Sequence, residues 1–269
     1  MRRRDGWLFE IVPPQNIAGG TFWKWMALEN GVLYAMVGEA EKSDPVIRAK
    51  SQQHGWPWDP LSPGFNEAEN PWGYGQTVLA IDPESQKVLW HYREETPIDS
   101  RAVCMKNGRI FLFRFGAFLT CLNAADGTVV WRKSPDGDRA IFESLGDYSH
   151  RQDWRTNWRT TVYLRCSDKA LYFAGPQVNK LLAVSAADGR ILWEDPYNNF
   201  QLIVRDDGVY GISGQIDDGH PSMKFEPLTG AEIAVGRRAC TRPTASVDSI
   251  FFRANGGRPG WIRPGTRLT

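Results

Sequence analysis

The stretch that decides the fold is LAVSAADGRILW at Leu182–Trp193, because it returns twice elsewhere in the chain. The other copies read LAIDPESQKVLW at Leu79–Trp90 and TCLNAADGTVVW at Thr120–Trp131. In each copy a polar residue is followed four positions later by Gly or Gln and eight positions later by Trp. A degenerate fourth copy keeps the spacing with Glu226, Gly230 and Ala234. Repetition at a fixed spacing indicates stacked, similar structural units.

A second phrase precedes the copies: a turn followed by β-branched and aromatic residues. It starts at Asn30, Asn107, Asp168, Asp207 and Asp248. Asn-Gly and Asp-Gly supply the positive φ angles of a two-residue hairpin turn. Each unit therefore predicts an inner strand A, a tight turn, strand B, a connection, strand C, a second turn and an outer strand D. That is one four-stranded blade.

The period supports this interpretation. The phrases at 207 and 248 are 41 residues apart, as are Trp90 and Trp131, and propeller blades repeat every 40 to 50 residues or so. The sequence predicts an all-β protein, a β-propeller of four-stranded antiparallel blades with about four to five blades. Trp90, Trp131 and Trp193 are predicted to pack against the next blade, with the small residue and the glycine leaving room for the ring.

Composition narrows the classes of partner. The 269 residues include 12 Trp and 13 Phe, and the net charge is +1. A nearly neutral chain has no global field for nucleic acid, and no apolar run approaches the roughly 18 residues of a membrane span. The first residues do not follow the pattern of a signal peptide. The widely spaced Cys104, Cys121, Cys166 and Cys240 predict buried thiols rather than a zinc site or a redox dithiol.

The repeats are predicted to occupy residues 1–257, with long insertions at about 39–75 and 138–160. Residues 258–269 form a basic Pro/Gly segment where strand C of another blade should begin, which favours an incomplete propeller. An open blade face and strand edge would promote self-association.

Both insertions are expected on one face. Antiparallel strands alternate in direction, so B–C and D–A connections share one rim, here called the loop face, and the tight A–B and C–D turns share the other, the turn face. The insertions combine aromatic and hydrogen-bonding residues, with candidate ligand-binding residues at Trp56, Trp58, Trp72, His150 and Trp154. They predict a surface for a protein partner or a small polar ligand. Loops that simply cover the core are the alternative.

The predicted starts of the inner strands suggest a second feature of this rim. They fall at Lys24, Arg101, Val162, Gln201 and Arg242. Three basic residues among five predict an anion-binding ring, unless they pair with loop carboxylates. Cys240 lies near Arg242 and is a further candidate, but no His is fixed beside it, so no catalytic residue is assigned.

The pattern Ala/Cys-x-Asp/Asn/Ser-x-x-x-Gly-x-x-x-Trp resembles the tryptophan-docking repeat of the pyrroloquinoline-quinone-like (PQQ-like) propellers, over roughly residues 20 to 255. This family includes quinoprotein dehydrogenases and a non-catalytic outer-membrane assembly lipoprotein. The resemblance implies a periplasmic or exported protein. Quinone-binding members also need calcium or a lanthanide, a carboxylate base and often a vicinal disulfide. No adjacent Cys pair is present, and no metal ligand can be assigned.

Two functions follow from these observations. The favoured one is a non-catalytic binding or scaffold module that acts through its loop face. The alternative is part of a quinoprotein-type oxidoreductase, an alcohol or sugar dehydrogenase that uses pyrroloquinoline quinone (PQQ) with calcium.

Overall fold

The computed structural model describes residues 17–18, 20, 22–39, 73–146, 162–175, 178–212, 220–236, 244–245 and 250–251. The central parts of both predicted insertions and the segment 258–269 lie outside these residues.

Four antiparallel sheets, each of four strands, make up most of the described chain. Blade 1 contains β1 (Phe22–Glu29), β2 (Val32–Gly38), β3 (Tyr74–Asp82) and β4 (Lys87–Asp99). Blade 2 contains β5 (Val103–Lys106), β6 (Arg109–Arg114), β7 (Phe118–Asn123) and β8 (Val129–Lys133). Blade 3 contains β9 (Tyr163–Cys166), β10 (Ala170–Ala174), β11 (Leu181–Ser185) and β12 (Ile191–Asp195). Blade 4 contains β13 (Gln201–Arg205), β14 (Gly208–Ile212), β15 (Met223–Phe225) and β16 (Glu232–Val235).

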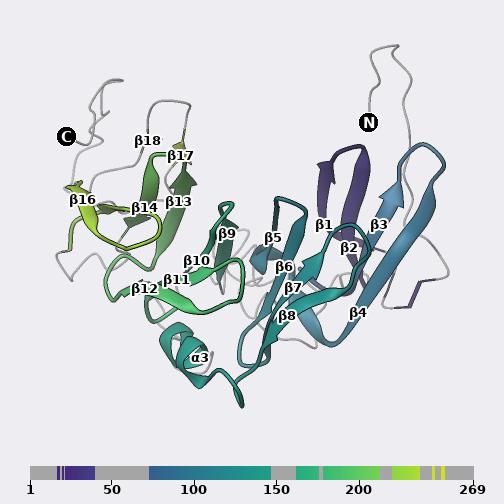
Figure 1. Ribbon diagram of the computed structural model, residues 1–269, viewed down its shortest axis with the longest axis horizontal. Helices are drawn as coiled ribbons and strands as arrows, with labels where there is room; N and C mark the ends of the chain where they lie inside the picture. The colour runs from purple at the N-terminus through teal and green to yellow at the C-terminus, as the bar shows by residue number, and fades with distance from the viewer. Residues whose placement is uncertain are drawn as a thin grey trace, which may run out of the picture.

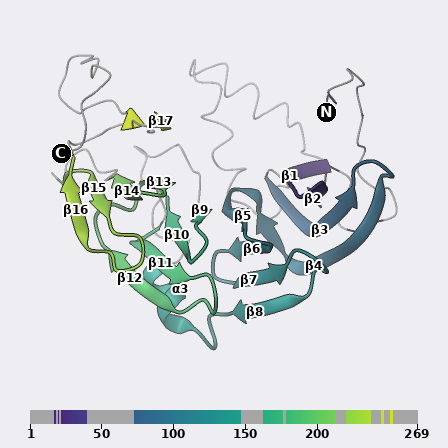
Figure 2. The same cartoon turned by 45° about the horizontal axis from the view of Figure 1, so that its top comes forward.

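The sheets stand side by side in chain order (Figure 1). Figure 2 shows them as an arc, with β1, β5, β9 and β13 on the inside and β4, β8, β12 and β16 on the outside. A two-stranded sheet of β17 (Thr244–Ala245) and β18 (Ile250–Phe251) follows blade 4. The prediction of an all-β propeller with four-stranded antiparallel blades is confirmed.

Within the described residues, two short helices interrupt the strands: a 3-10 turn, η1 (Ser100–Ala102), and α3 (Arg139–Leu145). The sequence did not predict α3, which occupies the start of the second insertion. Its residues Ile141, Phe142 and Leu145 are buried in the core between blades 2 and 3. A single turn or two of helix gives a periodicity too short to distinguish from a loop.

The A–B turns of blades 1 and 2 have the predicted geometry, whereas Asp207, at the A–B turn of blade 4, does not have a positive φ angle. Asn30 and Gly31 have φ angles of 51° and 80°, and Asn107 and Gly108 have 55° and 67°. Positive φ at both central residues is the type I′ turn that matches the twist of a hairpin. The C–D turns place Gly127, Gly189 and Gly230 at φ of 74°, 72° and 70°.

The core lies between blades rather than within them. Along β6, Ile110 and Leu112 face blade 1, whereas Phe111 and Phe113 face blade 3. Because both faces of the middle strands are covered, β6, β10 and β11 are continuous apolar runs instead of alternating ones.

The tryptophans connect consecutive blades, as predicted. Trp90 Nε1 donates to the Ala124 carbonyl oxygen at 2.9 Å, Trp131 Nε1 to that of Ala186 at 3.1 Å, and Trp193 Nε1 to that of Pro227 at 2.9 Å. Each acceptor lies in the C–D turn of the following blade, directly after its polar residue. The same contact therefore repeats at three blade junctions.

The turn glycines make room for these rings. A Cβ built on Gly127 would lie 2.5 Å from Trp90 Cε3, whereas one built on Gly108 would meet nothing within 4 Å. Both positions have positive φ, so Ala at either is strained by roughly 1 to 2 kcal/mol. We expect Gly127→Ala to lower the free energy of unfolding by at least about 1 kcal/mol more than Gly108→Ala, because it also displaces Trp90. Urea unfolding of the two variants checks this, and equal losses would contradict the docking contact.

Blade 4 replaces this arrangement. In blades 1 to 3 an aromatic residue on strand B, a small residue on strand C and the Trp on strand D face one another across the sheet, as Tyr34, Ala80 and Trp90 do in blade 1. The corresponding residues in blade 4 are Tyr210, Lys224 and Ala234. Lys224 Nζ lies 5.2 Å from the centroid of the Tyr210 ring and 2.9 Å from Asp207 Oδ2. Lysine thus stands where a small residue otherwise accommodates the Trp.

The ion pair between Lys224 and Asp207 in blade 4 is expected to be sensitive to acid. Burial raises the pKa of Asp207, but hydrogen bonds from Tyr210 and Lys224 and the charge of Lys224 outweigh it and lower the pKa to about 2. A carboxylate with a depressed pKa stabilises the fold above its ordinary pKa of 3.8 and loses that contribution as pH falls towards 2.

We therefore expect Asp207→Asn to lower the free energy of unfolding by about 1 kcal/mol at pH 7. This is less than the full pKa shift would give, because the Asp207 side chain is partly exposed and solvent screens the ion pair. The gap in melting midpoint between wild type and variant should narrow between pH 4 and pH 2. Asp206→Asn, one residue earlier, is the control and should leave the midpoint unchanged. A gap that is constant with pH would contradict the ion pair.

Candidate functional site

The described connections show that the two rims are distinct. On the turn face, Lys106 Nζ and Asp168 Oδ1 lie 3.8 Å apart, and each belongs to an A–B turn. On the loop face, the rings of Tyr197 and His220 stack with centroids 3.6 Å apart. Tyr197 lies in a D–A connection and His220 in a B–C connection. Connections of these two types thus meet at one rim, as the alternation of strand direction predicts.

Arg101 lies at the loop face and forms a largely buried ion pair with Asp99. Its Nε lies 2.7 Å from Asp99 Oδ1 and its Nη2 lies 2.8 Å from Asp99 Oδ2, which is a bidentate arrangement. The side chains are 15% and 4% exposed. Although burial lowers the pKa of Arg101, the Asp99 carboxylate raises it overall above its ordinary value. Asp99 also accepts from the Arg101 backbone N–H at 3.0 Å and so begins η1.

Tyr74, the first residue of β3, lies between two arginines. Arg101 Nη2 donates to its hydroxyl at 3.3 Å, and the Arg114 guanidinium carbon lies 4.6 Å from its ring centroid. Burial raises the pKa of Tyr74, and the Asp99 charge raises it further. Arg114, at the end of β6, is partly exposed and forms no ion pair among the residues that the structure describes. It therefore presents a positive charge on an aromatic support.

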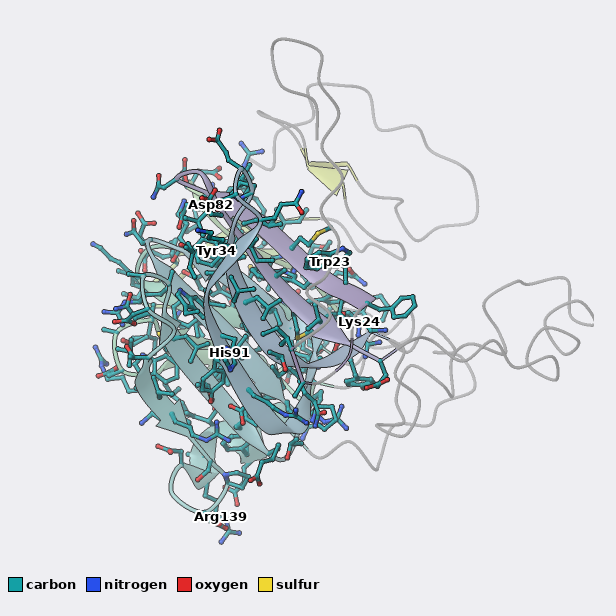
Figure 3. All side chains as sticks on the ribbon, turned by 90° about the vertical axis from the view of Figure 1, so that its right-hand side faces the viewer. Trp23, Lys24, Tyr34, Asp82, His91 and Arg139 are labelled. Atoms are coloured by element: carbon teal, nitrogen blue, oxygen red, sulfur yellow. The ribbon has the colours of Figure 1, made fainter. Side chains whose placement is uncertain are left out.

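The other described candidates of the predicted ring lie on the same inner edge. Lys24 is on β1, and its Cε would be 3.0 Å from a Cβ built on Gly38, the last residue of β2. Figure 3 shows Lys24 well away from Asp82, which marks the turn face of that blade. Gln201 begins β13 and is buried, with Nε2 3.5 Å from the Tyr163 hydroxyl. Arg101 is paired with the Asp99 carboxylate, in agreement with the alternative interpretation of the ring. That Lys24, Arg101 and Arg242 converge on one bound anion stays a prediction.

Aromatic groups mark the other described end of this face. Tyr197 stacks on His220 with an interplanar angle of 16° and remains 48% exposed. Nearby, the Asp195 carboxylate accepts from the Tyr197 and Asn198 backbone N–H groups at 3.0 and 2.7 Å, which fixes the loop after β12. These hydrogen bonds hold the backbone at Tyr197, so the position of the exposed ring is defined.

Comparison with known proteins agrees with the repeat. Residues 75–199 match the family model of the outer membrane protein assembly factor BamB. Residues 75–199 therefore resemble PQQ-like repeats. No match was found among curated proteins. Among solved structures, BamB from Moraxella catarrhalis is similar at a TM-score of 0.41 and 11% identity, covering 89% of this chain and 67% of its own.

Two computationally designed proteins are also similar. Ika8 is similar at a TM-score of 0.46 and 9% identity, and the match covers 87% of this chain and 69% of Ika8. Ika4 is similar at a TM-score of 0.44 and 9% identity, and the match covers 77% of this chain and 93% of Ika4. All three scores are below 0.5, so the PQQ-like assignment rests on the repeats and on the sheets themselves.

Quinone-dependent members of the PQQ-like family need a metal held by carboxylate and amide oxygens, and the described residues do not fit that requirement. No three His, Cys, Asp or Glu side chains within the described part of the chain are grouped to hold a metal ion. The Asp99 carboxylate, which lies at the inner rim, is occupied by Arg101. No step of chemistry through a quinone is derived from these residues.

Several candidates lie outside the described residues. They are Trp56, Trp58, Trp72, His150, Trp154, Cys240 and Arg242. None of the described helices is long and apolar enough to cross a membrane.

Three contributors were not predicted from the sequence: Asp99, Arg114 and the Tyr197–His220 stack. The strand count places both members of the stack on the loop face, so that signal was present. Asp99 ends a long strand D two residues before Arg101 and belongs to no repeated pattern.

Proposed function

We propose that this PQQ-like propeller is a non-catalytic binding module that docks a protein partner on its loop face. The observation that carries the proposal is the Tyr197–His220 stack at this rim, in which the Tyr197 side chain stays 48% exposed. Tyrosine supplies a large contact area with few rotatable bonds, which is why it is enriched at protein interfaces.

Arg114 adds the second residue type that interfaces favour. It is partly exposed, rests on the buried Tyr74 ring and carries no carboxylate partner in the described chain. A partner with an acidic or aromatic group opposite it would gain a charge-assisted contact without first breaking an ion pair. Arg101, in contrast, is already neutralised, so it supports the rim rather than offering a free charge.

The test compares two double variants. The loop-face variant is Tyr197→Ala with Arg114→Ala. The matched turn-face variant is Leu228→Ala with Lys169→Ala, which likewise removes one exposed apolar side chain and one cation. Tagged wild type and both variants are used to capture proteins from cells that make the chain, after equal melting midpoints have shown that all three are folded.

The proposal expects one or more proteins that bind the wild type and the turn-face variant and are depleted at least about tenfold with the loop-face variant, as for the loss of an interface hot spot. The same recovery with all three would overturn the assignment of the loop face.

A further inference from the structure

Two cysteines from different blades meet at the junction of blades 2 and 3. Cys104 is on β5 and Cys166 is on β9, the innermost strands of their blades, and these strands lie side by side (Figure 2). Two residues further along each strand direction, Lys106 and Asp168 form their ion pair at 3.8 Å. The ion pair joins the ends of these two neighbouring strands, and each cysteine lies two residues before its member of the pair, so Cys104 and Cys166 lie at a similar level.

Both thiols face the same space. Cys104 lies opposite Phe111 in its sheet and Cys166 opposite Leu171, and both cysteines pack against the core cluster that contains those two residues. The two thiols lie close enough for each to shift the pKa of the other. Each is partly exposed and each is a free thiol in this structure.

Their surroundings make the two sulfurs chemically unequal. Burial raises the pKa of Cys104 well above its ordinary value, and the hydrogen bond to Cys166 raises it further. The pKa of Cys166 is lowered by that same hydrogen bond and by the charges of Lys106 and Arg165, against the effect of burial. The thiolate is the nucleophilic form of cysteine, so Cys166 is the more reactive sulfur.

We propose that Cys104 and Cys166 are a redox-active pair that closes to a disulfide across the junction of blades 2 and 3. The oxidant is a low-molecular-weight disulfide such as oxidised glutathione. The Cys166 thiolate attacks one sulfur of the donor, its S–S bond breaks, and one glutathione thiolate leaves. Cys104 then gives up its proton and attacks the Cys166 sulfur, which releases the second glutathione. Two electrons pass from the cysteines to the donor.

This inference departs from the prediction of simple buried thiols. That prediction rested on spacing, since the two cysteines are 62 residues apart in sequence. Cys121 shows why proximity alone does not suffice: it is buried in the same core cluster, and its sulfur lies 3.8 Å from Arg109 Nη1. It provides an internal control from the same junction.

The experiment places the full chain in a series of reduced and oxidised glutathione. Free thiols are counted, tryptic peptides are mapped without reduction, and the melting midpoint is recorded. The variants are Cys104→Ser, Cys166→Ser and the control Cys121→Ser. The proposal expects a fall from four free thiols to two, a Cys104–Cys166 linked peptide, and a midpoint raised by about 10 °C, as for a bridge closing a loop of roughly 60 residues.

The variants separate the proposal from its competitors. Cys121→Ser should behave as the wild type, and Cys104→Ser should trap glutathione on Cys166. Linkage of either cysteine to Cys121 or Cys240, or glutathione that stays on Cys166 of the wild type without forming the bridge, would overturn the proposal. A reducing agent should return the melting midpoint fully to its value before oxidation.

Discussion

Trp131→Ala is expected to lower the free energy of unfolding by about 3 to 5 kcal/mol, the range for removal of a large packed aromatic side chain. The Trp131 ring lies 6.1 Å from that of Phe111 in its own blade and contacts the turn at Gly189 in the next one. Its Nε1 also satisfies the Ala186 carbonyl. Loss of the ring opens the junction on both sides. Thermal unfolding should show a midpoint lower by about 10 °C.

Trp131→Phe is the matched control. It keeps most of the apolar ring but leaves the Ala186 carbonyl without its donor, so a smaller loss of about 1 to 2 kcal/mol is expected. An unchanged midpoint for Trp131→Ala would show that the ring does not join the blades.

Asp99→Ala has the second large expected effect, a loss of again about 3 to 5 kcal/mol in the free energy of unfolding, because it removes the bidentate carboxylate partner of the buried Arg101 guanidinium. The pair is bidentate and Asp99 is nearly inaccessible to solvent. Denaturant unfolding measures the loss.

Two variants check the cause. Asp168→Ala breaks the exposed ion pair with Lys106 and should change stability by less than about 1 kcal/mol. The double variant Asp99→Ala with Arg101→Leu should be more stable than Asp99→Ala alone, since the buried cation is then removed together with its carboxylate partner. Additive losses in the double variant would contradict the account of a buried pair.

The fold could be predicted from the sequence because each repeated residue performs a local task. The positive φ of Asn107 and Gly108 follows from a turn that such residues form most readily. Gly127 and Trp131 are four residues apart in sequence. Gly127 packs against Trp90 of the preceding blade, and Trp131 packs against the turn at Gly189 of the following blade. These constraints recur, so their pattern is visible without a structure.

The site was less predictable because its contacts cross between elements without repetition. Arg101 was predicted at the start of an inner strand but lies in η1, just before β5, and its partner Asp99, two residues earlier, gave no periodic signal. The change to Lys224 in blade 4 is visible in the sequence as a lysine where the other copies have Ala or Cys. Its meaning depends on the neighbouring Tyr210 and Asp207, which the sheet register brings alongside it.

The position of Cys104 and Cys166 illustrates the same limit. Neither spacing nor composition relates them, whereas the stacking of inner strands puts them level. Contacts between blades are set by the curvature of the arc and by strand register, and single-residue patterns do not encode either quantity.

We propose that this chain of PQQ-like repeats binds a partner and does not use the quinone itself. The most direct measurement is a titration of the purified, folded, calcium-supplemented chain with PQQ, following quinone absorbance together with dye-linked oxidation of alcohols and sugars. The account predicts neither a saturable absorbance change nor turnover. Saturable binding accompanied by turnover would contradict it and establish the dehydrogenase alternative.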